Sequence, residues 1–376
     1  MPPSCWRTRK LFESPPFWMW IVGFLLLLGP LVTLHELGHY LVGRWFGVKA
    51  EAFSIGFGKE LWGRTDRRGT RWKLAAIPLG GYVQFKGDMN PASIPDPDAP
   101  AESDTFQSKS LWQRALIVFA GPATNLLITV AIFASFNLAY GKYEANNAID
   151  SFAEESVAQE AGMEVGDRIV SIDGYVIEDF ADIGPRVLMY PGKEIEITFV
   201  RDGREQSLPI AIGESIETDQ FGNESRVGRL GVYSGAPQVV SVGPVESVTL
   251  AFEQSWGLVK MMVTGIAQIF TGDRSLQELG GPIKIAKYSG EQLSLGPQAF
   301  VSFAALISIN LAFINLLPIP ALDGGHLAFY AAEAIRRKPV SARGMEWAYR
   351  TGVALVLMLM VVVTVNDLIS LPLFGS

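Results

Sequence analysis

Four stretches of this chain are apolar and long enough to cross a lipid bilayer, and they limit the possible folds more than any other feature. A membrane-spanning helix needs about 20 predominantly apolar residues. The four stretches are residues 17–34, 115–136, 299–317 and 351–365. Hydrophobic residues make up 49% of the 376 residues and charged residues only 18%, which is unusual for a soluble protein. The sequence therefore predicts a polytopic α-helical membrane protein with four transmembrane helices.

A fifth stretch, residues 244–270, is apolar but is interrupted by Glu246, Glu253 and Lys260. This pattern is more typical of an amphipathic helix at the membrane interface than of a span, although a span remains the alternative. With four spans, the first and the third run in the same direction, and their C-terminal ends reach the same depth. A fifth span between them would place those two ends on opposite sides of the membrane.

The first apolar stretch leads into an HExxH motif, which extends from His35 to His39 and contains two of the three histidines. Residues four apart lie on one face of a helix, so both histidines can bind one metal ion. Glu36 then lies beside that metal and can take a proton from a water molecule, as in zinc metalloproteases. A chance match is the alternative, but a buried glutamate among apolar neighbours is costly unless it is used. The motif predicts a catalytic zinc site within the membrane.

Catalytic zinc usually takes three protein ligands, so a third ligand has to come from elsewhere in the chain. Asp323 is the best candidate, because it follows two prolines that break the third apolar stretch and precedes two glycines that allow the backbone a close approach. His326 is the competing candidate. An acidic side chain at a broken helix within the membrane is typically functional, which favours Asp323. Taken alone, Asp323 could instead cap a helix in an ordinary loop.

The charges of the connecting segments predict the orientation. Residues 44–114 carry 11 Lys and Arg residues and residues 336–350 carry five, whereas residues 142–246 carry 20 acidic and eight basic residues. Cytoplasmic segments are rich in Lys and Arg, so we expect the first two segments in the cytoplasm and the acidic segment outside. The basic residues at positions 7–10 favour the opposite orientation. The formal net charge of −7 gives no support for nucleic-acid binding.

Three motifs occur together in this chain. They are HELGH (residues 35–39), GPATN (residues 121–125) and NLLPIPALDGGH (residues 315–326). In combination they resemble the site-2 protease family of intramembrane zinc metalloproteases, and more narrowly the bacterial regulator-of-sigma-E protease branch. The resemblance covers nearly the whole chain.

The resemblance implies a role for each residue of these motifs. It implies that Zn²⁺ is the cofactor, with His35, His39 and Asp323 as ligands and Glu36 as general base. It also implies that Asn310 and Asn315 contact the substrate or support the site, with interhelical hydrogen bonding as the alternative for both. Asn125 is expected to pack the core.

Residues 70–86 combine strand-forming side chains with a Gly80-Gly81 pair, and we interpret them as a β-hairpin that dips toward the membrane. The resemblance implies a membrane re-entrant β-loop at this place. An exposed edge there could hold an unwound substrate by strand addition, with Gly80, Gly81 and Tyr82 as substrate-binding residues. An ordinary cytoplasmic hairpin is the alternative.

Residues 143–236 lack long apolar runs and contain short strand patterns with Asp-Gly turns at 173–174 and 202–203. Residues 161–177, expected to form a helix, a turn and a strand, resemble bacterial PDZ domains. Residues 229–232 resemble the peptide-binding loop of a circularly permuted PDZ domain. We therefore expect one inserted external PDZ-like α/β domain, whereas better-known relatives have two. It could bind a trimmed substrate tail, exclude bulky substrates, or only stabilise the protein.

These features divide the chain into four parts. Residues 1–142 hold the first two transmembrane helices, the HExxH motif and the cytoplasmic β-loop, and residues 143–236 form the external domain. Residues 237–297 form the interfacial amphipathic segment, and residues 298–376 hold the last two transmembrane helices with the LDGG motif.

The predicted function is that of a zinc endopeptidase of the bacterial inner membrane that cuts single-span membrane proteins within or near the bilayer. The resemblance implies regulated intramembrane proteolysis in a stress response, with an anti-sigma factor already shortened by an external protease as substrate, or remnant signal peptides. Membrane lipid is the other expected partner. A catalytically silent PDZ-bearing membrane scaffold is the alternative, and it predicts a damaged metal site. A transporter would need span repeats or several intramembrane charges, which the sequence lacks.

Overall fold

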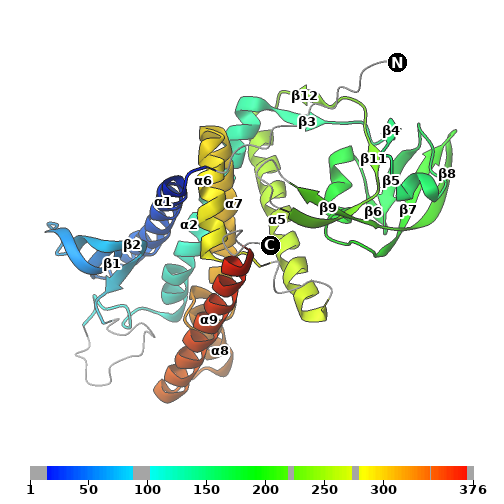
Figure 1. Cartoon of the computed structure of the whole chain (residues 1–376). Helices are drawn as coiled ribbons and strands as arrows, with labels where there is room; N and C mark the ends of the chain where they lie inside the picture. Colours follow the sequence, from blue (N-terminus) through cyan, green and yellow to red (C-terminus); the bar gives the residue numbers. More distant parts are fainter. Residues whose placement is uncertain (1–14, 88–101, 219–223, 273–278, 339, 371–376) are drawn as a thin grey trace. The chain divides into compact units, whose positions relative to one another are not determined.

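The computed structural model describes residues 15–87, 102–218, 224–272, 279–338 and 340–370. Within them the chain divides into two compact units (Figure 1). The helical unit combines Pro15–Phe133 with Ser275–Ser376, and the β-rich unit comprises Ala134–Arg274. One long helix, α2, contributes residues to both units. The basic residues at positions 7–10, which bear on the orientation, lie outside the described residues.

Six helices of the described residues build the helical unit. They are α1 (Phe17–Trp45), α2 (Leu111–Tyr140), α6 (Pro282–Ser294), α7 (Pro297–Leu316), α8 (Asp323–Arg336) and α9 (Ala342–Ser370). Among the described residues, four helices are long and apolar enough to cross a membrane, namely α1, α2, α7 and α9. This confirms the four predicted spans. Helix α1 continues beyond its apolar stretch and carries the whole HExxH motif on its last turns.

Within residues 237–297, for which the sequence predicts an interfacial amphipathic segment, the described residues include two helices. Helix α5 (Pro244–Thr271) belongs to the β-rich unit, and α6 belongs to the helical unit. Helix α6 packs closely on α1, because a Cβ atom added at Gly23 would lie 2.7 Å from the carbonyl carbon of Ser289. Small residues let two helices approach in this way. The 13-residue α6 is too short to cross a bilayer and is held against the first span.

A β-hairpin follows α1. Its strands are β1 (Ala50–Thr65) and β2 (Arg71–Phe85). The turn is held by Asp66, whose Oδ1 accepts hydrogen bonds from the backbone N–H groups of Arg68 and Thr70 at 2.8 and 3.0 Å. The turn therefore lies at residues 66–69, and the hairpin is longer than the segment 70–86 in which the sequence predicts it.

The pairing within this hairpin also differs from the prediction. Phe53 faces Val83 on one side and Trp72 on the other, so residues 52–55 lie between the two ends of β2. The two halves of residues 70–86 consequently do not pair with each other. Both strands bend at glycines with positive φ, including Gly56 at +89° and Gly80 at +111°, which few other residues adopt. Among the described strands, none pairs with the outer edge of residues 81–85.

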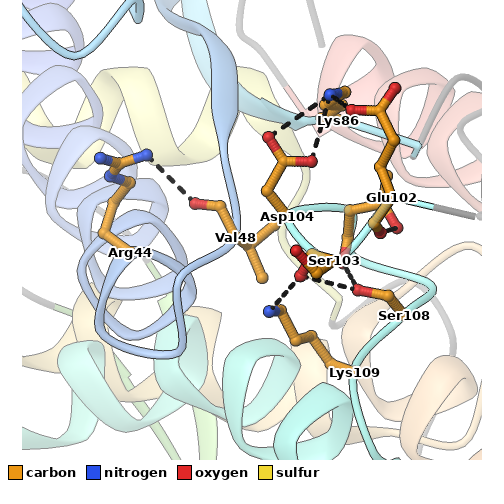
Figure 2. Close-up of polar contacts among 9 residues, drawn as sticks. Arg44, Val48, Lys86, Glu102, Ser103, Asp104, Ser108 and Lys109 are labelled. Carbon is orange, nitrogen blue, oxygen red and sulfur yellow. Dashed lines mark hydrogen bonds and ion pairs between the residues drawn. The ribbon is translucent and has the colours of Figure 1, made fainter.

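Polar contacts connect the end of this hairpin with the segment that precedes α2 (Figure 2). The Lys86 ammonium forms ion pairs with Glu102 and with Asp104, and its Nζ lies 3.1 Å from the Asp104 Oδ1. Lys109 donates from Nζ to the Ser103 carbonyl at 2.7 Å. The Lys86 contacts tie the end of β2 to the segment that precedes α2.

The β-rich unit has short strands around one apolar core. Its elements are β3 (Lys142–Glu144), β4 (Ser151–Phe152), α3 (Val157–Glu160), β5 (Arg168–Ile172), β6 (Tyr175–Val176), η1 (Phe180–Asp182), α4 (Gly184–Val187), β7 (Glu194–Arg201), β8 (Arg204–Ala211), β9 (Gly213–Thr218), β10 (Glu224–Arg229), β11 (Val232–Tyr233), β12 (Gln238–Val240) and α5. The largest sheet has the order β6-β5-β7-β8. Ile169, Ile197 and Phe199 are fully buried in its core.

The predicted Asp-Gly turns of this unit are confirmed. Asp173-Gly174 joins β5 to β6 and Asp202-Gly203 joins β7 to β8, and all four residues have positive φ, as tight hairpin turns require. The predicted helix within residues 161–177 is displaced, because α3 ends at Glu160. The Ser156 side chain caps that helix by accepting from the Gln159 N–H at 3.2 Å.

Candidate metal centre

The two motif histidines lie one helical turn apart on the buried face of α1. His35 and His39 are each 7% exposed, and their rings pack edge to face with centroids 4.9 Å apart. Their Nε2 atoms lie 3.2 Å from each other. The i, i+4 spacing therefore brings two imidazole nitrogens to one point, as the sequence predicts.

Asp323 reaches the same point from a different part of the unit. It is the first residue of α8, after the proline-containing break that ends α7. Its Oδ2 lies 3.1 Å from His35 Nε2 and 3.4 Å from His39 Nε2. Among the described residues, His35, His39 and Asp323 are the one group of potential metal ligands whose donor atoms gather, all within 4.8 Å. His326, the competing candidate, is not part of this group.

The geometry of these three atoms fits a zinc ion. With zinc–ligand bonds of about 2.0–2.1 Å, neighbouring ligands of a tetrahedral site lie about 3.3 Å apart. The observed separations of 3.1, 3.2 and 3.4 Å match that spacing. The Asp323 Oδ2 is buried and forms no hydrogen bond although it faces both imidazoles, and a buried carboxylate oxygen in that state needs another partner. A bound cation would satisfy it.

The neighbouring helix α2 shapes the site with a glycine and a carbonyl group. His39 Nδ1 lies 2.8 Å from the Ile117 carbonyl oxygen, which can only accept a hydrogen bond. The proton of His39 therefore lies on Nδ1, and Nε2 keeps the lone pair that a metal needs. A Cβ atom added at Gly121 would collide with the His39 ring and would lie 2.7 Å from His35 Nε2. Only glycine leaves room for both ligands here.

Asn125, one turn after Gly121, lies beside the other histidine. Its side chain is fully buried, and Nδ2 lies 3.3 Å from His35 Nδ1. The sequence predicts core packing for Asn125 and no specific role for Gly121. The signal that could have found them is their i, i+4 spacing in GPATN, which places both on one helix face, as in HExxH.

The β-hairpin reaches the predicted base. The backbone N–H of Val83 on β2 donates to Glu36 Oε2 at 3.1 Å. A Cβ atom added at Gly81 would lie 2.7 Å from the Ser54 carbonyl oxygen, so this glycine permits the close approach of β2 to β1, and it would lie 3.6 Å from Glu36 Cγ. Glu36 thus follows His35 on α1 and contacts the outer edge of β2.

The other predicted substrate-binding residues lie on the hairpin and on helix α7. Tyr82 stacks on Phe57 with ring centroids 6.1 Å apart, and Gly80 also lies against Phe57, both on the same bend of the hairpin. Asn310 and Asn315 are half-buried on α7. Within the described residues neither amide forms a hydrogen bond, whereas Ser308 of α7 donates to the Asn125 carbonyl of α2.

Comparisons with known proteins agree with this geometry. The sequence model of Peptidase family M50 matches residues 23–359. The chain belongs to peptidase family M50. A protein of Agrobacterium fabrum named as a zinc metalloprotease is 42% identical over 362 residues, which cover 94% of this chain and 96% of that protein. A zinc metalloprotease by name from Rhizobium meliloti is 43% identical, covering 92% of this chain and 95% of the relative.

The Regulator of sigma-E protease RseP of Escherichia coli is 30% identical, covering 92% of this chain and 98% of the relative. That alignment spans 451 positions, more than the 376 residues of this chain, so RseP contains stretches without a counterpart here. The predicted family, enzyme class and cofactor are confirmed. The protein is a zinc metalloprotease of family M50, and its described residues include four helices that can span a membrane.

Proposed function

We propose that this protein is an intramembrane endopeptidase that cuts single-span membrane proteins, with His35, His39 and Asp323 as zinc ligands. The observation that carries the proposal is that the three donor atoms gather on helices of the bilayer-spanning bundle, with Glu36 beside them. A soluble metalloprotease has no need to place its metal site on such helices. The complete set of donor atoms disfavours the silent scaffold.

The chemistry follows from the positions of the side chains. When bound, zinc activates a water molecule and polarises the carbonyl group of the scissile bond. Glu36 accepts the proton of that water and later delivers it to the leaving amine. Asp323 and the two imidazoles keep their lone pairs directed at one point, and Gly121 keeps that point free of other atoms.

A transmembrane substrate has to unwind before it can be cut, because its backbone groups are paired within its own helix. The outer edge of residues 81–85 could supply replacement partners by strand addition. This edge lies next to Glu36, since the Val83 N–H already donates to that carboxylate. We propose that Gly80, Gly81 and Tyr82 contact the extended substrate, and that Asn310 and Asn315 of α7 do so from the side of the helix bundle.

The β-rich unit is proposed to be a single PDZ-like domain on the external side, with the metal centre toward the cytoplasm. The two Asp-Gly hairpins and the position of Leu230, whose carbonyl accepts from Ser156 Oγ at 3.1 Å, support a PDZ-like arrangement near residues 229–232. The excess of acidic residues in 142–246 supports the orientation. Likeness to RseP supports an anti-sigma factor as substrate in the inner membrane.

The test compares the wild-type chain with Glu36→Gln in cleavage of a tagged single-span protein that has a short external tail. Glutamine keeps the size of the side chain and leaves the ligands intact but cannot accept the proton. We expect cleavage to fall by about 10²–10⁴-fold while zinc content stays at one ion per chain. Unchanged cleavage by Glu36→Gln would assign the reaction to another protein or another site.

A further inference from the structure

Asn125 holds an unusual position among the buried polar groups of the helical unit. It lies on α2 and is fully buried, and its side chain faces His35 Nδ1 at 3.3 Å. Its Oδ1 is also buried and has no hydrogen-bond partner. A buried amide oxygen without a partner destabilises a protein, so this arrangement needs a reason.

His35 requires an acceptor at the place where Asn125 lies. Its Nε2 faces Asp323 and His39, and it can bind a metal only with its lone pair, so the proton of the ring has to be on Nδ1. An Nδ1–H group cannot bond to the NH₂ end of an amide, because both groups are donors. It can bond to the oxygen end, which lies in the same place when the amide is turned by 180° about its last bond.

His39 shows what such a partner does in the same site. Its Nδ1 donates to the Ile117 carbonyl at 2.8 Å, and a backbone carbonyl leaves no choice of donor or acceptor. Ile117 and Asn125 lie on the same helix, two turns apart, and each faces the outer nitrogen of one histidine. The main chain of α2 orients one imidazole, and a side chain of α2 is placed to orient the other.

We propose that Asn125 is a positioning residue of the metal centre, whose amide oxygen accepts the Nδ1–H of His35 and so keeps Nε2 available to zinc. The inference rests on the assignment of His35 as a ligand. Outer partners of this kind fix the orientation and the protonated nitrogen of a metal-binding histidine, and their loss lowers metal affinity by about 10–100-fold. Main-chain contacts also hold Asn125, since its carbonyl accepts from Thr129 and from Ser308 of α7 at 3.0 and 2.9 Å.

The test measures zinc affinity of the full-length purified protein by competition with a chelator. Asn125→Leu removes the acceptor and keeps the approximate size, and we expect zinc affinity to fall about 10–100-fold. Asn125→Asp keeps an acceptor oxygen and removes the NH₂ group, and we expect an affinity within about threefold of the wild type. Ser308→Ala is the matched control, because it removes a buried hydrogen bond to the Asn125 backbone without touching the side chain.

Each outcome distinguishes orientation of His35 from simple packing. Wild-type affinity in Asn125→Leu overturns the proposal, and so does an equal loss of affinity in Asn125→Asp and Asn125→Leu. If Asn125→Leu fails to fold, the comparison of Asn125→Asp with Ser308→Ala still decides, since an affinity loss above about tenfold in Asn125→Asp contradicts an acceptor role. A His35→Ala variant that binds zinc as the wild type would instead show that the ligand assignment is wrong.

Discussion

The helical unit contains two aspartates near the ends of its helices, one half-buried and one fully buried, and their surroundings differ. Asp367 of α9 is fully buried and accepts hydrogen bonds from the backbone N–H groups of Gly281, Ile283 and Lys284, each at 2.9 Å. These N–H groups lie at the start of α6 and have no partner within the helix. Asp323 lies at the start of α8, and its Oδ2 faces two histidine nitrogens without forming a hydrogen bond.

The difference separates a structural carboxylate from one that we propose to be a metal ligand. A carboxylate at a helix N-terminus is stabilised by the backbone N–H groups and by the helix dipole, so Asp367 needs nothing further. Asp323 Oδ2 keeps an unused lone pair beside the Nε2 lone pairs of the two histidines. Three lone pairs that face one another cannot form hydrogen bonds, so protein groups alone do not satisfy them. The same type of side chain thus fixes α6 to α9 in one region and prepares a metal site in the other.

The largest expected effect is on zinc. Asp323→Asn replaces one donor oxygen by an amide, and we expect zinc affinity to fall by more than about 100-fold, beyond the loss typical of an outer partner. Asp367→Asn should leave affinity within about twofold, since Asp367 faces α6 and not the donor atoms. Metal content after dialysis against graded chelator measures both. Equal losses of zinc affinity in the two variants would show that Asp323 contributes no more to zinc binding than Asp367 does.

Each region also contains a glycine that permits its close contacts. A Cβ atom at Gly121 would strike the His39 ring, and one at Gly281 would lie 2.7 Å from Asp367 Oδ2. We expect Gly121→Ala to lower zinc affinity about 10-fold or more by displacing the ligands, and Gly281→Ala to lower only the thermal unfolding midpoint. Zinc affinity and the midpoint in detergent, measured on both variants, form the test. Loss of zinc affinity in Gly281→Ala would contradict it.

A smaller effect is expected on stability alone. Asp367→Asn replaces one acceptor oxygen by a donor that faces backbone N–H groups, so we expect the free energy of unfolding to fall by about 1–3 kcal/mol. The control is Asp367→Glu, which keeps the charge but displaces it from the start of α6. Protection of α6 amides from hydrogen exchange reports the change, and full protection of these amides in Asp367→Asn would show that the cap contributes nothing.

The smallest effect concerns a third aspartate, in the β-rich unit. Burial by itself raises the pKa of the Asp167 carboxyl, but hydrogen bonds from Arg201 at 2.6 and 2.7 Å and from the Glu164 N–H overcome it, so the pKa lies below its ordinary value. The stabilisation is complete above the unfolded-state pKa of about 3.9 and is lost as the pH falls through the folded-state value.

We therefore expect the urea midpoint of strands β5, β7 and β8 to stay constant from pH 7 to pH 5 and to fall below about pH 4. In Asp167→Asn the midpoint at pH 7 should be lower and the decline below pH 4 weaker. Glu205→Gln, at an exposed position of β8, is the matched control. Hydrogen exchange of peptides from these strands, followed in a urea series, gives the midpoints. If the midpoint of Asp167→Asn declines below pH 4 as much as that of the wild type, Asp167 is not the cause of the decline.

Local features of the sequence predicted the elements and the meeting of the two histidines, whereas Asp323 was predicted from the need of catalytic zinc for a third ligand. HExxH places His35 and His39 together because the period of a helix is fixed by the backbone, and four apolar runs became four helices because a bilayer sets their length. The Asp-Gly pairs formed turns because these residues tolerate positive φ. Each of these predictions depends on residues close in the chain.

The partners of those elements were decided by tertiary packing. Asp323 lies beside histidines that precede it by almost 290 positions. Residues 52–55 lie between the two halves of β2. Helix α6 packs on α1, although the sequence predicts an interfacial segment there. The positions of Asn125 and Gly121 against the histidines likewise follow from how α2 lies on α1. Contacts of this kind depend on side-chain shape across the whole unit, because a helix or strand with one buried face can pack in several ways. The sequence determined which groups could hold zinc, and only the packed structure decided which of them meet and what orients them.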